Sequence, residues 1–159
     1  MISDSAHLPQ LPHRRDTPIG CIGSGFIMSD CHLVAYKNAG FNPVAIASRT
    51  PANSRKVAGR HGLKAYETYP EMLEQADIEV VDVAVPPDAQ LDVIREITRH
   101  AGKIRGILAQ KPLGINYQQA VEIVSLCELS LIHISEPTRL LSIWDAVLWV
   151  EKKRGGGGG

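Results

Sequence analysis

The sequence has few of the residues that mark several protein classes. Only 5% of its 159 residues are aromatic, and the 17 basic residues are balanced by 17 acidic ones. A balanced charge gives no reason to expect a nucleic-acid or anionic-membrane partner. No apolar run is long enough to span a membrane, and the N-terminus lacks the basic-then-apolar order of a signal peptide. We therefore expect a cytoplasmic protein with room for one domain.

Cysteine and histidine are present without a metal-binding pattern. Cys21, Cys31 and Cys127 are odd in number, form no CxxC pair and lie in or beside apolar segments. We interpret them as small buried hydrophobic residues in a reducing compartment. The six histidines show no ligand spacing, so the sequence predicts no metal site.

What the sequence does contain is a strand, a glycine turn and a helix near its N-terminus. The apolar residues 19–22 stop at the Gly-Ser-Gly of residues 23–25, and an amphipathic segment follows. In the dinucleotide-binding fingerprint GxGxxG/A, the first glycine makes the turn, the second lets a pyrophosphate approach the backbone and the third allows close helix packing. Met28 departs from the pattern at the third position. We predict that the pyrophosphate is bound by Gly23, Ser24, Gly25, Phe26 and Ile27.

The residues after the next apolar run predict which cofactor is bound. Ser48, Arg49 and Thr50 stand about twenty residues past the glycines, where the fingerprint expects the residue that contacts the ribose. A carboxylate there would repel a 2′-phosphate, whereas a hydroxyl beside a guanidinium suits it. We therefore predict NADP in preference to NAD. The alternative is that Arg49 is a solvated loop cation and Thr50 only caps a helix beginning at Pro51, and both interpretations can hold together.

Strand-like and helix-like segments alternate along the rest of the chain. Apolar runs predict strands at residues 19–22, 44–47, 64–66, 78–85 and 104–109, and helices at about 26–38, 51–61, 68–75, 88–100 and 117–128. This alternation indicates an α/β fold with a Rossmann-like, doubly wound parallel sheet. In such a sheet, ligands bind beyond the carboxyl ends of the strands.

Short motifs carry a family resemblance: IGSGFI followed by His32-Leu33, then AIASRT, VDVAVPPDAQ, AGK and QKPLG. With these motifs, residues 17–128 resemble the N-terminal nucleotide-binding domain of the Gfo/Idh/MocA family of NAD(P)-dependent oxidoreductases. Gln110 replaces the glutamate of the family's Glu-Lys-Pro motif, and Gln90 stands where many members carry histidine. Both keep hydrogen-bonding capacity but remove an ionisable group.

The resemblance implies hydride transfer between NAD(P) and a hydroxyl-bearing carbon of a sugar, cyclitol or related compound. Lys111 would be catalytic, by polarising or orienting the reacting oxygen, and a cis bond between Lys111 and Pro112 would fix its direction. An ordinary surface lysine before a turn proline is the alternative. The remaining residues implied to contact the cofactor are Val85, Pro86, Gln90, Gln110, Lys111 and Pro112. The full-length parent would have a small-molecule substrate and would form a homo-oligomer through a second domain.

Both ends of the chain differ from this domain. Residues 1–16 hold prolines and basic residues with few apolar ones, and we expect a disordered tail. Residues 129–139 read LSLIHISEPTR, which looks like a translated sequencing adapter, and the run EKKRGGGGG is what a run of A passing into a run of G encodes. A natural linker with a flexible glycine end is the alternative. We interpret residues 129–159 as a non-native tail, with the fold truncated before its sixth strand and its C-terminal α/β domain.

These interpretations leave two functions open. A nucleotide-binding domain of an oxidoreductase requires Lys111, and we expect this chain by itself to be inactive because it supplies only the cofactor side of the cleft. A non-catalytic dinucleotide-binding sensor or scaffold would keep the glycine turn but would not require Lys111. Replacing Lys111 in the full-length parent distinguishes the two.

Overall fold

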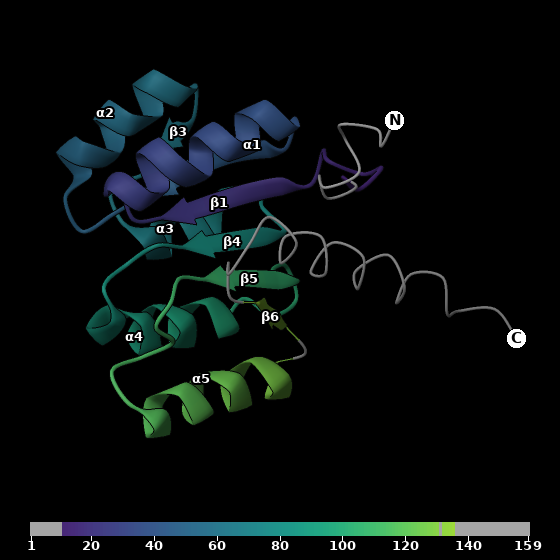
Figure 1. Cartoon of the computed structure of the whole chain (residues 1–159), viewed down its shortest axis with the longest axis vertical. Helices are drawn as coiled ribbons and strands as arrows, with labels where there is room; N and C mark the ends of the chain where they lie inside the picture. Colours follow the sequence, from purple (N-terminus) through teal and green to yellow (C-terminus); the bar gives the residue numbers. More distant parts are fainter. Residues whose placement is uncertain (1–10, 131, 136–159) are drawn as a thin grey trace, which may run out of the picture.

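A computed structural model describes residues 11–130 and 132–135 of the chain (Figure 1). The sheet has six strands in the order β3-β2-β1-β4-β5-β6, and each strand pairs in parallel with its neighbours. The strands are β1 (Pro18–Ile22), β2 (Asn42–Ala47), β3 (Lys64–Ala65), β4 (Val80–Val83), β5 (Gly106–Ala109) and β6 (His133–Ser135). The predicted Rossmann-like parallel sheet is confirmed.

Helices connect the strands as the sequence predicts, with one irregularity. They are η1 (Ile27–His32), α1 (Leu33–Ala39), α2 (Pro51–His61), α3 (Tyr69–Gln75), α4 (Pro87–Thr98) and α5 (Tyr117–Leu129). The segment predicted as one regular helix from residue 26 begins with the π-helical η1, in which the Leu33 N–H bonds to the Met28 carbonyl. A π turn is wider than an α turn. It lies where Met28, in the place of the third fingerprint glycine, is fully buried.

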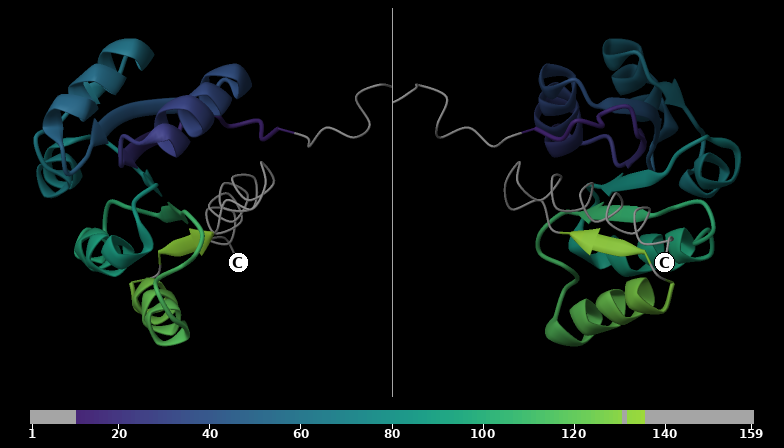
Figure 2. Two further views of the ribbon diagram at one scale, coloured as in Figure 1. Left: turned by 60° about the vertical axis from the view of Figure 1, so that its left-hand side comes forward. Right: turned by 90° about the vertical axis from the view of Figure 1, so that its right-hand side faces the viewer.

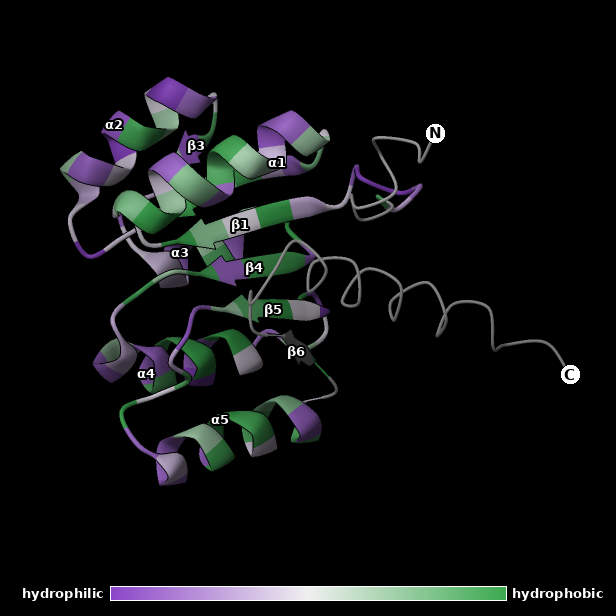
Figure 3. Cartoon of the chain, in the orientation of Figure 1, coloured by the Kyte–Doolittle hydropathy of each residue, from purple (hydrophilic) through white to green (hydrophobic). Residues whose placement is uncertain are grey.

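The core lies on both faces of the sheet because successive strand residues point to opposite sides. On one face, Cys21, Ile46 and Leu108 pack with residues of η1, α1 and α2. On the other, Ile22, Val81 and Ile107 pack with residues of α3, α4 and α5. Figure 2 shows helices on either side of the strands, and Figure 3 shows hydrophobic strands and helices whose outer faces are hydrophilic. The sheet is therefore doubly wound, as predicted.

The sheet has one strand more than the sequence predicts. The sequence predicts truncation before a sixth strand, but β6 pairs with β5 from Gly106↔His133 to Leu108↔Ser135, so this prediction is wrong. An edge strand exposes a row of unpaired backbone N–H and C=O groups, which an extended neighbouring segment can satisfy whatever its origin. The prediction of a non-native tail falls mostly on residues 136–159, which lie outside the described residues.

The segment before β1 has no regular secondary structure but contacts the domain. Pro12 and Thr17 are buried. The Arg14 guanidinium lies 3.4 Å from the Glu79 carboxylate, and the Asn42 side chain donates to the Asp16 carbonyl at 3.0 Å. Residues 1–10, where most of the predicted disordered tail falls, lie outside the described part of the chain. In the described part, no helix is both long and apolar enough to cross a membrane.

The cysteine prediction holds for two of the three residues. Cys21 and Cys127 are buried, and burial raises the pKa of the Cys127 thiol to about 11. Cys31 is exposed, so its interpretation as a buried hydrophobic residue is wrong. It lies in η1, where the π turn changes the angular position of each residue relative to a regular helix.

Candidate functional site

Four strands end side by side at the carboxyl edge of the sheet, which is the border formed by the last residues of the strands. Ile22, at the end of β1, is paired with Ala47 of β2 and with Val83 of β4, and Val83 is paired with Ala109 of β5. The pairing continues one step further, because the Gly23 N–H donates to the Ala47 carbonyl at 2.9 Å and the Gln110 N–H donates to the Val83 carbonyl at 2.9 Å. The loops that follow β1, β2, β4 and β5 therefore start next to one another, at the edge where open α/β sheets bind ligands.

The glycine turn after β1 has the conformation that its sequence predicts. Gly23 is buried and has a φ of +112°, and a Cβ there would stand 2.2 Å from the Ala84 carbonyl oxygen. Only glycine fits this position without a shift of β4's loop. A Cβ at Gly25 would meet nothing within 4 Å. The backbone at Gly25 is thus open to a close approach from outside, with Phe26 and Ile27 exposed beside it.

The loop after β2 holds a chain of three serine hydroxyls with an exposed cation next to it. Ser48 Oγ lies 2.8 Å from Ser24 Oγ and 2.7 Å from Ser54 Oγ of α2, and Ser54 is fully buried. Arg49 is exposed, and none of the ion pairs among the described residues includes it. Thr50 occupies the N-cap position of α2, but its side chain makes no cap hydrogen bond. The glycine turn and the β2 loop are therefore joined through Ser24 and Ser48.

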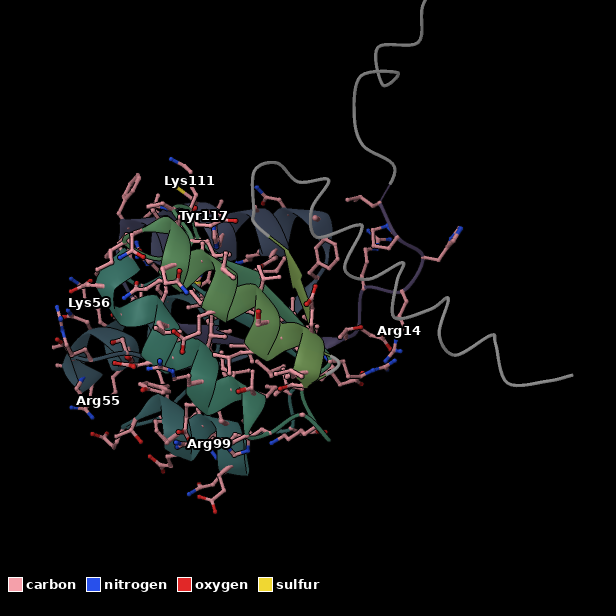
Figure 4. All side chains as sticks on the ribbon, turned by 90° about the horizontal axis from the view of Figure 1, so that it is seen from below. Arg14, Arg55, Lys56, Arg99, Lys111 and Tyr117 are labelled. Atoms are coloured by element: carbon pink, nitrogen blue, oxygen red, sulfur yellow. The ribbon has the colours of Figure 1, made fainter. Side chains whose placement is uncertain are left out.

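The loop after β5 presents Lys111. Its side chain is exposed, and Figure 4 shows it at the outside of the molecule, pointing away from the ribbon and far from Arg14. The Lys111–Pro112 bond is cis, as predicted. The Lys111 N–H donates to Oε1 of Gln110 at 2.9 Å. Val85 and Pro86, in the loop after β4, are half-buried and exposed respectively.

Gln90 lies beneath this loop and not on its surface. The sequence predicts it as a cofactor contact, but the structure buries it completely in α4. Its amide Nε2 donates to the Gln110 carbonyl at 2.6 Å and to the Pro112 carbonyl at 3.0 Å. These carbonyls flank Lys111, so both amide hydrogens of Gln90 hold the backbone on either side of the lysine. Gln90 is therefore placed to support the loop and not to contact a ligand.

A buried carboxylate lies beneath the same edge. Asp82, in the centre of β4, is fully buried, and its Oδ2 accepts hydrogen bonds from the Tyr36 hydroxyl at 2.6 Å and from His32 Nδ1 at 2.8 Å. On the other side of the imidazole, His32 Nε2 lies 3.4 Å from Nε2 of Gln110. A chain of polar contacts thus runs from the core of the sheet to the residue before Lys111.

The electrostatics of this group follow from burial and from the Asp82 charge. Burial lowers the pKa of His32, but the hydrogen bond and the negative charge of Asp82 outweigh it, so that the net shift is upward. Burial raises the pKa of Tyr36 and of Cys21, and the Asp82 charge adds to both effects. Tyr36 and Cys21 therefore stay neutral over the physiological range, and His32 is left as the group that titrates.

No sequence motif singles out Asp82, Tyr36 or Ser54, and His32 stands only within a longer motif. A single acid inside an apolar strand is the signal that would have identified Asp82, because a buried charge requires partners. In the described part of the chain, no group of three or more His, Cys, Asp or Glu side chains is arranged to hold a metal ion.

Comparison with known proteins agrees with this geometry. The profile described as "Oxidoreductase family, NAD-binding Rossmann fold", of the Gfo/Idh/MocA family, matches residues 18–130. The rhizopine catabolism protein MocA of Rhizobium meliloti is 27% identical over 116 residues, which are 73% of this chain and 35% of that protein. The chain therefore spans about a third of the length of this relative.

Two solved structures share the fold. KijD10, a 3-ketoreductase from Actinomadura kijaniata in complex with NADP and TDP-benzene, is 26% identical with a TM-score of 0.69, covering 76% of this chain and 37% of that one. The WlbA dehydrogenase from Chromobacterium violaceum, in complex with NADH and UDP-GlcNAcA, is 17% identical with a TM-score of 0.71, covering 79% and 36%. With the family profile matched along most of its length, this chain belongs to the Gfo/Idh/MocA family of oxidoreductases and carries its NAD(P)-binding Rossmann domain.

Proposed function

We propose that this chain is the cofactor-binding part of an oxidoreductase that transfers a hydride between NADP(H) and a hydroxyl-bearing carbon of a sugar, cyclitol or related compound. The observation that carries the proposal is the meeting of the Gly23 turn and the Lys111 loop at one edge of the sheet. Loops at this edge would then contact both the pyrophosphate and the nicotinamide of a bound dinucleotide. The substrate class is supported by the 3-ketoreductase among the similar solved structures.

Each loop at this edge has residues that could bind a particular part of NADP(H). The open face at Gly25 allows the pyrophosphate to approach the backbone, with Ser24, Phe26 and Ile27 alongside. Ser48, Arg49 and Thr50 would meet the 2′-phosphate. Val85, Pro86, Gln110 and Pro112 would line the path from the ribose to the nicotinamide, and Gln90 would hold that path from below. The bound nicotinamide supplies the hydride chemistry.

Lys111 is the proposed catalytic residue. Its ammonium can donate a hydrogen bond to the reacting oxygen and so favour the developing charge on that oxygen. We also propose that the complete protein is cytoplasmic, where a phosphorylated nicotinamide cofactor is available, and that it forms a homo-oligomer through the part of the family's fold that this chain does not include.

Cofactor choice is tested with Arg49→Ala in this chain. A charge-assisted contact to a phosphate contributes on the order of 1.5–3 kcal/mol, so NADPH should bind at least roughly tenfold more weakly while NADH binding is unchanged. Titrations of both cofactors by fluorescence provide the measurement. Lys56→Ala is the matched control, because it removes the same charge from an exposed position of α2 that Figure 4 marks. Equal losses for NADPH and NADH in Arg49→Ala would contradict the preference.

Catalysis is tested with Lys111→Ala in a full-length parent. We expect turnover to be lost while cofactor affinity changes by less than about threefold, because Lys111 acts on the reacting oxygen and not on the phosphates. A non-catalytic sensor would bind cofactor equally well before and after the change and would show no turnover in either form. This chain alone should bind cofactor without turnover, since holding the substrate against the nicotinamide accounts for several kcal/mol of catalysis.

A further inference from the structure

The backbone of Lys111 is held from two sides by glutamine side chains. Gln90 bonds to the carbonyls of Gln110 and Pro112, on either side of the lysine. The Gln110 side chain bonds to the Lys111 N–H through Oε1. Gln90 is fixed by complete burial. Gln110 is only half-buried, so its amide orientation depends on what its other end meets.

That other end meets His32. Because Gln110 Oε1 accepts from Lys111, its Nε2 must face His32 Nε2, at 3.4 Å. An amide nitrogen only donates, so His32 Nε2 has to accept. The ring proton of neutral His32 must then lie on Nδ1, where it donates to Asp82 at 2.8 Å. Every contact in this chain of groups requires the same tautomer of His32.

We propose that His32 is a positioning residue for the Lys111 loop, acting through Gln110. When His32 is neutral with its proton on Nδ1, Nε2 holds the Gln110 amide in the orientation that binds the Lys111 N–H. When His32 is protonated, Nε2 becomes a donor and faces the Gln110 amide nitrogen, donor against donor. Gln110 must then turn its oxygen toward His32, and the Lys111 N–H loses its acceptor.

The surroundings allow only His32 to act in this way. Among the described residues, the titratable groups that face its ring are Asp82 from β4 and Tyr36 from α1, with Cys21 of β1 electrostatically coupled to both. Asp82 is buried and accepts hydrogen bonds from the Tyr36 hydroxyl and the His32 ring, and burial keeps Tyr36 and Cys21 neutral. A proton gained or lost in this cluster near neutral pH is therefore carried by His32.

This inference rests on the proposed function only for the importance of Lys111, and its test uses no cofactor or substrate. The ¹⁵N-labelled chain is titrated by NMR between about pH 5.5 and 9. We expect the ring nitrogen shifts of neutral His32 to report a proton on Nδ1. We also expect the Lys111 amide signal to shift with the same midpoint as the His32 ring.

Two variants separate the two ends of the imidazole. His32→Asn places an amide near the Nδ1 position, so it keeps the contact with Asp82 and removes the one with Gln110. His32→Gln reaches the Nε2 position and keeps the contact with Gln110. The Lys111 amide should exchange with solvent about tenfold faster in His32→Asn, and His32→Gln should recover at least part of the protection. His100→Asn, in the turn after α4, is the control and should change neither readout.

The outcomes are distinct. The proposal is overturned if the Lys111 amide signal does not shift with the His32 titration, or if neutral His32 carries its proton on Nε2. Both measurements use the unchanged chain, so they decide the question even if both variants fail to fold. Equal exchange of the Lys111 amide in His32→Asn and in the unchanged chain also overturns it. A chain that shows the coupling but binds no NADP(H) would contradict the proposed function and leave this inference standing.

Discussion

On the β1–β2 side of the sheet edge, the groups open to a ligand are held by backbone geometry, whereas on the β4–β5 side they are held by buried polar side chains. The first side depends on Gly23, whose φ of +112° no other residue adopts easily and where a Cβ would meet the Ala84 carbonyl. The second side depends on Gln90 and Asp82, which are fully buried and hydrogen-bond to residues outside their own helix or strand.

The difference shows how each side can fail. A backbone turn that excludes every Cβ is lost all at once when a side chain is added. A loop held by several hydrogen bonds loses its order in steps, because each bond contributes about 1 kcal/mol and leaves the others in place. We therefore expect single substitutions to have large effects on folding at the glycine turn and intermediate, local effects beneath Lys111.

The largest effect is expected from Gly23→Ala. Its Cβ would stand 2.2 Å from a backbone oxygen, at a φ that L residues rarely adopt, so we expect a loss of at least about 3 kcal/mol in the free energy of unfolding. Urea denaturation gives the measurement. Gly25→Ala is the matched control, because its Cβ meets nothing within 4 Å. It should keep stability within about 1 kcal/mol but weaken cofactor binding.

The next effect is expected from Gln90→Ala. Two hydrogen bonds to the Gln110 and Pro112 carbonyls are lost inside the protein, and we expect a loss of about 1–3 kcal/mol in the free energy of unfolding. Faster amide exchange should be confined to the Lys111 loop. The control is Gln118→Ala, at an exposed position of α5. Uniformly faster exchange over the whole domain would show that Gln90 supports the core and not the loop.

A smaller effect is expected from Ser54→Ala on the β1–β2 side. Ser54 is fully buried, and its hydroxyl bonds to Ser48 at 2.7 Å, so its removal should cost about 1 kcal/mol in stability. If the backbone holds this side, the glycine turn should keep its structure, and NADPH affinity should change less than in Arg49→Ala. Ser125→Ala, exposed on α5, is the control. A loss as large as that of Gly23→Ala would end the contrast between the two sides.

The difference between a backbone turn and buried side-chain contacts also explains how much of the molecule could be predicted from the sequence. The alternation of apolar runs predicted the parallel sheet, and Gly23 predicted its own turn because a positive φ favours one residue type. The contacts beneath Lys111 join residues 20, 50 and 78 positions apart, from Gln90 to Gln110, from His32 to Asp82 and from His32 to Gln110. No local pattern records such pairs. β6 escaped prediction for another reason, since pairing at a sheet edge depends on the backbone more than on side chains.

The smallest effect is the pH dependence of stability that His32 contributes. Because the Asp82 bond and charge raise the pKa of folded His32 against the opposing effect of burial, the folded chain binds the proton more tightly than the unfolded chain. The resulting stability is fully present below the unfolded pKa, about 6.5, and is lost as the pH rises through the folded value. The unchanged chain should therefore exceed His32→Asn in free energy of unfolding most at about pH 5.5–6 and least above the folded pKa.

Urea denaturation of the two chains across this range measures that difference, and His13→Asn, at an exposed position, corrects for a surface histidine. A difference that grows with rising pH would mean that burial and the Gln110 contact outweigh Asp82, so that the neutral ring is the form that the fold prefers. In that case the β4–β5 side would favour the neutral His32 that orders the Lys111 loop. If the difference in free energy of unfolding shrinks with rising pH, as we expect, the fold favours the protonated His32 ring at low pH. As the pH rises, His32 loses its proton and the Lys111 loop becomes ordered, while the folded chain loses a small part of its stability.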